Sequence, residues 1–124
     1  MDVYQHYLYI LECPYQHVGC YKDSKYRAMR LLEGVDSTFL QGHYRTRGKE
    51  SIRYCYLEAL MKGFVMFGLQ DGGQCWGGTF IDHKHSKYGL SKDCHDGKGG
   101  IWSNDVYKIN NRCQAINSKS FAIS

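Results

Sequence analysis

Three histidines and several aspartates lie close together in the chain and are the residues best suited to hold a metal ion. His83 and His85 alternate, so an extended segment would place both on one face, and His95 follows nearby. Imidazole and carboxylate groups bind zinc or copper, so a metal site could use them. The carboxylates that could complete it are Asp82, Asp93 and Asp96. A solvated loop would contain the same residue types, and we expect this simpler interpretation, with no metal.

The sequence contains no pattern that is typical of a catalytic site. It has no Gly-x-Ser-x-Gly, no His-Glu-x-x-His and no paired carboxylates. Residues 96–100 match only part of a calcium-binding loop, because the spaced carboxylates and the distal Glu are missing. We therefore expect a protein that is not an enzyme and that needs no cofactor.

A second group of residues has the chemistry of carbohydrate recognition. Aromatic rings stack on the apolar faces of pyranoses, while Asp, Asn and Gln side chains hydrogen-bond the hydroxyl groups in a shallow cleft. The candidate sugar-binding residues are Gln70, Asp71, Trp76, Tyr88, Trp102, Asn104 and Asp105. The two tryptophans could instead pack around disulfides in the core of a small domain, and the sequence leaves this alternative open for each of them.

Six cysteines are spread through the chain without any Cys-x-x-Cys pair. They are Cys13, Cys20, Cys55, Cys75, Cys94 and Cys113. Structural zinc sites favour close pairs of ligands, so this spacing disfavours zinc. An even number of separated cysteines in a small chain predicts three disulfides, and therefore a secreted, extracellular protein. Six cysteines allow fifteen pairings, and their positions alone do not choose among them.

Length and charge limit the number of domains and the classes of partner. The chain has 124 residues, of which 43% are apolar, enough for one compact domain over residues 1–124. Its formal net charge of +4 is spread along the chain, whereas nucleic-acid-binding proteins gather basic residues on one stripe. We therefore expect no nucleic-acid partner. No apolar run approaches the roughly 18 residues that a membrane span requires.

The clearest predicted helix covers residues 49–62. Its apolar residues recur at intervals of three and four, which gives one buried stripe. The stripe consists of Ile52, Cys55, Tyr56, Ala59 and Leu60. Ser51 or a neighbour could cap the start of the helix, and Gly63 is a natural residue to end it.

Strands are expected on both sides of this helix. The short apolar run at 64–69 is typical of a buried strand, and Asp-Gly-Gly at 71–73 predicts a turn into a second strand at 74–76. Further extended segments are expected at 4–11, 17–21 and 105–109. Residues 77–104 predict a long loop. We expect Cys94 and a few apolar residues to hold it: Phe80, Ile81, Tyr88, Leu90 and Trp102. The predicted fold class is α+β, a small disulfide-stapled domain with one main helix on an antiparallel sheet and a long irregular loop region.

Several short motifs follow one another along the chain in a characteristic order. They lie at 19–23, 27–29, around Cys55, and at 63–70, 75–76, 99–100 and 105–107. In this order they resemble the WSC domain, a small secreted cysteine-rich module, over about residues 17–109. The closest resemblance is to WSC-like modules of invertebrate extracellular proteins. The chain departs from the family because Ala59, Gly77 and Lys98 stand where WSC domains have cysteine.

The resemblance implies a PAN/apple-like fold in which a helix is stapled to a sheet. It also implies a nested disulfide map, with Cys20–Cys94 and Cys55–Cys75 in the core and Cys13–Cys113 joining the two terminal extensions. Proteins of the family are associated with polysaccharide binding, cell-wall sensing and extracellular matrix. The implied function is a secreted, lectin-like module whose partners are polysaccharides or glycoprotein glycans.

The composition leaves a second function open. Eleven tyrosines, fourteen glycines and a basic balance could serve a structural or adhesive extracellular-matrix protein. The tyrosines are scattered, however, and the repeats that are typical of adhesive proteins are missing. Carbohydrate binding is therefore the first hypothesis, and adhesion is the alternative.

Overall fold

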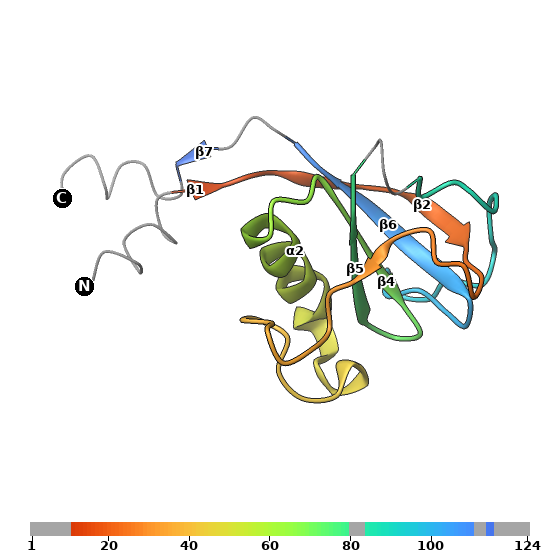
Figure 1. The fold of residues 1–124 in the computed structure, drawn as a ribbon, viewed down its shortest axis with the longest axis horizontal. Coiled ribbons are helices and arrows are strands. Elements are labelled where there is room, and N and C mark those ends of the chain that lie inside the picture. Colours follow the sequence, from red (N-terminus) through yellow and green to blue (C-terminus); the bar gives the residue numbers. More distant parts are fainter. Residues whose placement is uncertain (1–10, 80–83, 111–113, 116–124) are drawn as a thin grey trace, which may run out of the picture.

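A five-stranded antiparallel sheet with one α-helix packed against it forms the centre of the molecule (Figure 1). The computed structural model describes residues 11–79, 84–110 and 114–115. The strands of the sheet are β2 (Tyr15–Lys22), β3 (Arg30–Leu31), β4 (Met66–Gln70), β5 (Gln74–Gly78) and β6 (Ser103–Ile109). Their order across the sheet is β2-β6-β4-β5-β3. The helix α2 covers Ser51–Met61, so the predicted α+β class is confirmed.

The central strand β4 has core on both of its faces. All five of its residues are buried, which fits the continuous apolar run that predicted it. Phe67 and Leu69 belong to the core beneath α2, together with the helix residues Cys55, Tyr56 and Ala59. On the opposite face, a second and smaller core forms around one methionine of β4. Its buried residues are Met29, Met66, Trp76 and Val106.

The ends of the helix only partly follow the prediction. Gly63 has a φ of 80°, and its N–H donates to the carbonyl of Leu60, so it ends the helix as expected. Ser51 does not cap the start, because a 3₁₀ turn, η2 (Gly48–Glu50), precedes the helix. The Ser51 hydroxyl instead donates to the carbonyl of Gly48 within that turn. A second 3₁₀ turn, η1 (Tyr44–Thr46), comes before η2.

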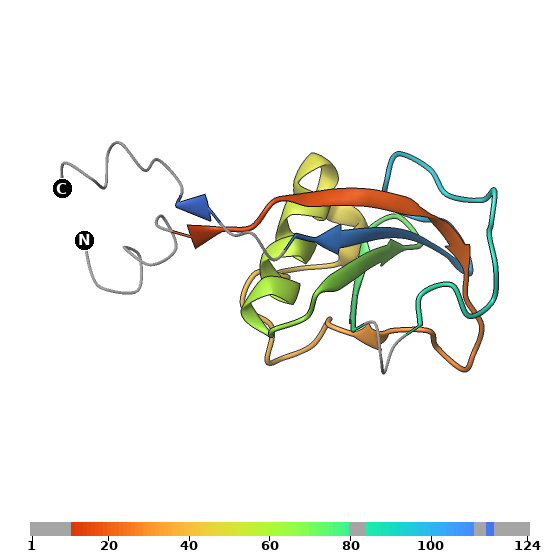
Figure 2. The same cartoon turned by 90° about the horizontal axis from the view of Figure 1, so that it is seen from above.

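Two of the predicted disulfides are present. Cys55–Cys75 joins α2 to β5, and Cys20–Cys94 joins β2 to the long loop. The third predicted pair, Cys13–Cys113, lies outside the described residues because Cys113 is not among them. The short strands β1 (Leu11–Glu12) and β7 (Gln114–Ala115) pair antiparallel and lie side by side at one end of the molecule (Figure 2).

The long loop is irregular over its described part, residues 84–102, as predicted. Figures 1 and 2 show it at the end of the sheet opposite to β1 and β7. Of the apolar residues expected to hold it, Leu90 is 70% and Trp102 46% exposed, whereas Tyr88 is half-buried and its hydroxyl bonds to the carbonyl of Tyr26. Cys94 and backbone hydrogen bonds also hold the loop, among them the Ser91 N–H to the carbonyl of Cys20 at 3.0 Å. Phe80 and Ile81, like the expected strand at 4–10, lie outside the described residues.

Candidate functional site

The guanidinium group of Arg27 lies between the two tryptophans of the chain. Its central carbon is 4.8 Å from the ring centre of Trp76 and 4.5 Å from that of Trp102. Trp76 comes from β5 and is only 4% exposed, whereas Trp102 precedes β6 and is 46% exposed. Cation–π attraction from Arg27 to both rings therefore links the exposed indole of Trp102 to the buried indole of Trp76.

A buried polar network holds Arg27 in this position. The Arg27 guanidinium donates to Asp23 Oδ2 at 3.2 Å and to Gln70 Oε1 at 3.1 Å. The Gln70 amide donates in turn to Asp23 Oδ2 and to Asn104 Oδ1. Burial raises the pKa of Asp23, but hydrogen bonds from the Ala28 N–H and from Gln70 outweigh it, and the pKa lies below its ordinary value. The carboxylate thus stays charged opposite the arginine at neutral pH.

The backbone of Trp102 is in a conformation that bulky residues rarely adopt. Its φ is 54°, in the left-handed region, where a residue other than glycine costs of order 1–3 kcal/mol. The turn is closed by reciprocal backbone hydrogen bonds between Gly100 and Ser103, and the Trp102 carbonyl accepts the N–H of Asp23 at 2.8 Å. The surrounding structure therefore holds a strained residue whose ring remains half-exposed.

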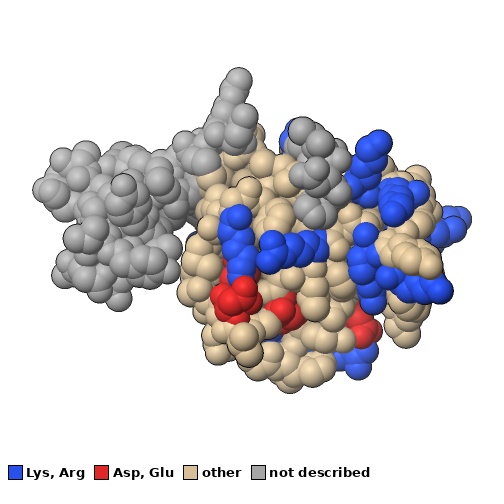
Figure 3. Space-filling view, in the orientation of Figure 1, with Lys and Arg blue, Asp and Glu red and all other residues tan. Residues whose placement is uncertain are grey.

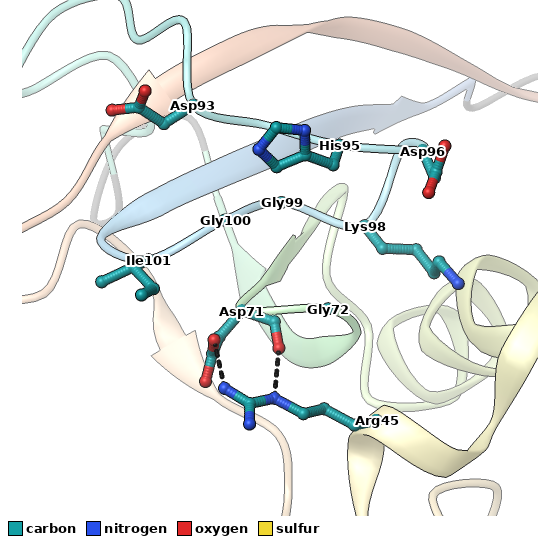
Figure 4. A pocket seen from close by; sticks show the side chains of 10 residues that line it. All are labelled: Arg45, Asp71, Gly72, Asp93, His95, Asp96, Lys98, Gly99, Gly100 and Ile101. Carbon is teal, nitrogen blue, oxygen red and sulfur yellow. Dashed lines mark hydrogen bonds and ion pairs between the residues drawn. The ribbon is translucent and has the colours of Figure 1, made fainter.

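A cleft of about 780 Å³ opens beside this turn. Figure 4 shows its walls: the loop of residues 93–101 on one side, and the turn between β4 and β5 with Arg45 on the other. The backbone connects the two walls, because the N–H of Asp71 donates to the carbonyl of Gly100 at 3.0 Å. Ile101, the neighbour of Trp102, lines one end of the cleft. The charged side chains in it are Arg45, Asp71, Asp93, Asp96 and Lys98.

Asp71 is the most firmly positioned carboxylate of the cleft. Its φ of 53° at the first position of an Asp-Gly turn is typical of a tight hairpin. One carboxylate oxygen accepts the Tyr44 hydroxyl at 2.6 Å, and the other accepts an Arg45 N–H at 2.6 Å. Hydrogen bonds from Tyr44 and then Arg45 lower the pKa of Asp71 from its ordinary value. The carboxylate is therefore ionised and held in one orientation at neutral pH.

The other predicted site residues lie elsewhere. Asp105 is buried in β6, where one oxygen accepts the Gly99 N–H at 2.8 Å and the other the His17 imidazole at 2.7 Å. The Tyr88 hydroxyl donates to the carbonyl of Tyr26, and this bond joins two surface loops. Asp105 thus positions Gly99, which lines the cleft, whereas Tyr88 is not among the residues that line it.

His85 and His95, two of the histidines considered as metal ligands, lie in different surroundings in the structure. His85 packs edge-on against Tyr21, and burial lowers its pKa. His95 is exposed in the cleft, and His83 lies outside the described residues. Within the described part of the chain, no three His, Cys, Asp or Glu side chains are grouped closely enough to hold a metal ion.

Of the seven residues predicted to bind sugar, the structure brings four together around Arg27. Gln70, Trp76 and Asn104 are buried there, so they support the surface rather than form it, while Trp102 is exposed. Sequence reasoning missed Arg27 and Tyr44. For Arg27, the available signal was its place in the 27–29 motif, close to the buried Asp23.

No helix in the described residues is both long enough and apolar enough to pass through a membrane. Comparison of the chain with protein-family models and with curated proteins gives no match.

Proposed function

We propose that this protein is a secreted, non-enzymatic carbohydrate-binding module that recognises polysaccharides or glycoprotein glycans. The observation that carries the proposal is Trp102: a half-exposed indole in a strained backbone conformation, stacked on Arg27. Strain of this kind persists where the surrounding structure enforces it, and it is concentrated at functional sites. Core packing gives no reason for the strain here, because the ring is at the surface.

The chemistry around Trp102 suits a sugar ring. An exposed indole offers a flat apolar face to the C–H groups of a pyranose, and the arginine on its other face keeps the ring from rotating. The adjacent cleft provides polar groups for the hydroxyls, above all the Asp71 carboxylate, which is already ordered by Tyr44 and Arg45. A site that is ordered before binding loses less entropy when the ligand arrives.

The extracellular part of the proposal rests on the cysteines. The disulfides Cys20–Cys94 and Cys55–Cys75 are compatible with an oxidising compartment. The resemblance of the motifs to the WSC domain points in the same direction. We assign no catalytic role to the residues of the cleft.

Retention on insoluble polysaccharides, with soluble oligosaccharide as competitor, tests this function. Trp102→Ala should lower retention about fivefold or more, because stacking on an aromatic ring contributes about 0.5–1.5 kcal/mol beyond the apolar area that it buries. Tyr54→Ala is the matched control, since Tyr54 is an exposed aromatic residue on α2, away from the cleft. Circular dichroism would establish that both variants are folded.

Two results would contradict the proposal. One is the failure of the wild-type protein to bind any member of a broad glycan array in a saturable manner. The other is a folded Trp102→Ala variant that binds as tightly as Tyr54→Ala. The adhesive alternative predicts instead adsorption to many unrelated surfaces. Its supporting observation is weaker, because among the described tyrosines only Tyr26 and Tyr54 are exposed.

A further inference from the structure

Four lysines and two tyrosines lie on two neighbouring segments, 22–26 and 84–88, the first of which is bonded to the turn of Trp102; we name these six residues the lysine–tyrosine surface. It consists of Lys22, Lys25, Tyr26, Lys84, Lys87 and Tyr88. From it we infer that the glycan bound by this module is an acidic polysaccharide, bearing carboxylate or sulfate groups. The inference rests on the proposed function, because it specifies the class of ligand for the same site.

The two segments that form this surface are held together directly. The Lys22 N–H donates to the carbonyl of Gly89 at 2.9 Å, and the Tyr88 hydroxyl donates to the carbonyl of Tyr26. The disulfide Cys20–Cys94 fixes the same pair of segments. The lysines therefore keep their relative positions although they come from distant parts of the sequence.

The charge of this surface is positive and largely uncompensated. All four lysines are exposed, and within the described residues none of them forms an ion pair with a carboxylate. The one acidic residue in segments 22–26 and 84–88 is Asp23, which is buried and already paired with Arg27. Figure 3 shows several Lys and Arg side chains at the end of the molecule where β2 ends, and others beside the visible acidic groups, which lie in the lower half of the view.

Each of two lysines lies close to the ring of the tyrosine that follows it in the sequence. The Lys25 ammonium lies 5.2 Å from the ring centre of Tyr26, and the Lys87 ammonium lies 5.2 Å from that of Tyr88. Segment 22–26 is also bonded to the turn of Trp102, through the Asp23 N–H. A chain of sugars stacked on Trp102 would thus have rings and cations continuing beyond it. This alternation suits a polymer that carries both apolar sugar faces and anionic groups.

A polysaccharide fits this surface better than a nucleic acid or a membrane does. The formal net charge of the chain is only +4 and its pI is about 8.7, below the values above about 9 that are typical of nucleic-acid-binding domains. The arginine next to the surface, Arg27, is already engaged by Asp23 and Gln70. The surface is made of loops, without the amphipathic helix that lies on lipid.

The experiment compares matched acidic and neutral polymers: alginate with carboxyl-reduced alginate, and dextran sulfate with dextran. The wild-type protein should bind at least one acidic polymer more than tenfold more tightly than its neutral counterpart. Lys25→Gln/Lys87→Gln should weaken binding to that acidic polymer about fivefold, as expected for the loss of two exposed ionic contacts. Lys49→Gln/Arg53→Gln removes the same number of charges from the α2 side and should leave the affinity unchanged.

The outcomes separate this inference from the proposed function. A preference for alginate alone or dextran sulfate alone supports the inference and identifies carboxylate or sulfate as the recognised group. Equal binding of acidic and neutral polymers overturns the inference but leaves carbohydrate binding intact. No binding to any polysaccharide overturns both. Equal losses in the two double variants, or tighter binding to polyuridylate or phosphatidylserine vesicles than to alginate and dextran sulfate, also overturn the inference.

Discussion

Replacing Arg27 by methionine removes the guanidinium group from between the two tryptophans while keeping an apolar side chain. The contact with buried Trp76 is worth up to about 2 kcal/mol, and that with half-exposed Trp102 about 0.5–1 kcal/mol. Gln70 Oε1 loses its donor, at about 1–3 kcal/mol, while Asp23 keeps its other donors. Because Arg27 is itself partly exposed, and methionine restores some packing, the free energy of unfolding should fall by about 2–4 kcal/mol.

Urea unfolding and iodide quenching of tryptophan fluorescence together measure this effect. The chain contains only two tryptophans, of which Trp102 is exposed and Trp76 is buried. In the wild-type protein iodide should quench the Trp102 emission and leave that of Trp76. In Arg27→Met the quenching constant, measured at a high and constant ionic strength that screens the lost positive charge, should rise because the Trp102 ring is released from its stack. Trp102→Ala should abolish most of the quenching and so assigns the signal.

Arg45→Met is the matched control. Arg45 also pairs with an aspartate, but the Arg45 side chain is exposed and the pair is screened by solvent, so its loss should lower the free energy of unfolding far less than the loss of Arg27 does. The reasoning fails if Arg27→Met and Arg45→Met have the same stability within about 0.5 kcal/mol. It also fails if Arg27→Met leaves the accessibility of Trp102 to iodide unchanged, because the arginine would then not hold the indole.

The remaining predictions concern acid, reductant and chelator, and the disulfide map. Hydrogen bonds keep the pKa of the Asp23 carboxyl below its ordinary value despite burial. The charged carboxylate therefore stabilises the folded state fully above a pH of about 4, and this stabilisation is lost as the pH falls through the folded-state pKa. Asp23→Asn should therefore flatten the acid side of a stability–pH profile, and parallel profiles would refute this. Reductant should lower the Tm sharply and EDTA should not. Non-reducing peptide mapping should find Cys13 joined to Cys113. This disulfide would close a loop of about 100 residues and contribute roughly 4.7 kcal/mol in the chain-entropy model. Cys13 joined to another cysteine would contradict the prediction.

The sequence predicted those parts of the fold that depend on local patterns. The stripe through Cys55, Tyr56 and Ala59 is fully buried, and the Asp-Gly-Gly turn joins β4 to β5 as expected, because periodicity and turn chemistry are local properties. The start of the helix shifted because η2 precedes it and satisfies the Ser51 hydroxyl internally. Glu58 was missed although it is fully buried, since its partners, the N–H groups of Thr38 and Phe39, lie in an irregular loop.

The candidate site was predictable only in its residue types. Whether Trp76 or Trp102 would be exposed depends on which strands are neighbours in the sheet and on the loop that brings Arg27 over β5. Periodicity contains no information on such long-range contacts. The same limit applies to Gln70 and Asn104, whose polar side chains suggested a surface but which are buried because they satisfy one another.

The way in which residues 84–98 are attached has a consequence for how the module could diversify. This loop is held by backbone hydrogen bonds and by Cys94, so few of its other side chains contribute to the core. Backbone bonds do not depend on side-chain identity, so substitutions outside Cys94 and the positive-φ positions Gly89, Asp96 and Gly97 should change the surface at little cost in stability. Descendants of this sequence could therefore acquire new ligand preferences by point mutation while α2 and the sheet remain the same. A combinatorial library in this segment, displayed on the unchanged scaffold, would exploit the same tolerance.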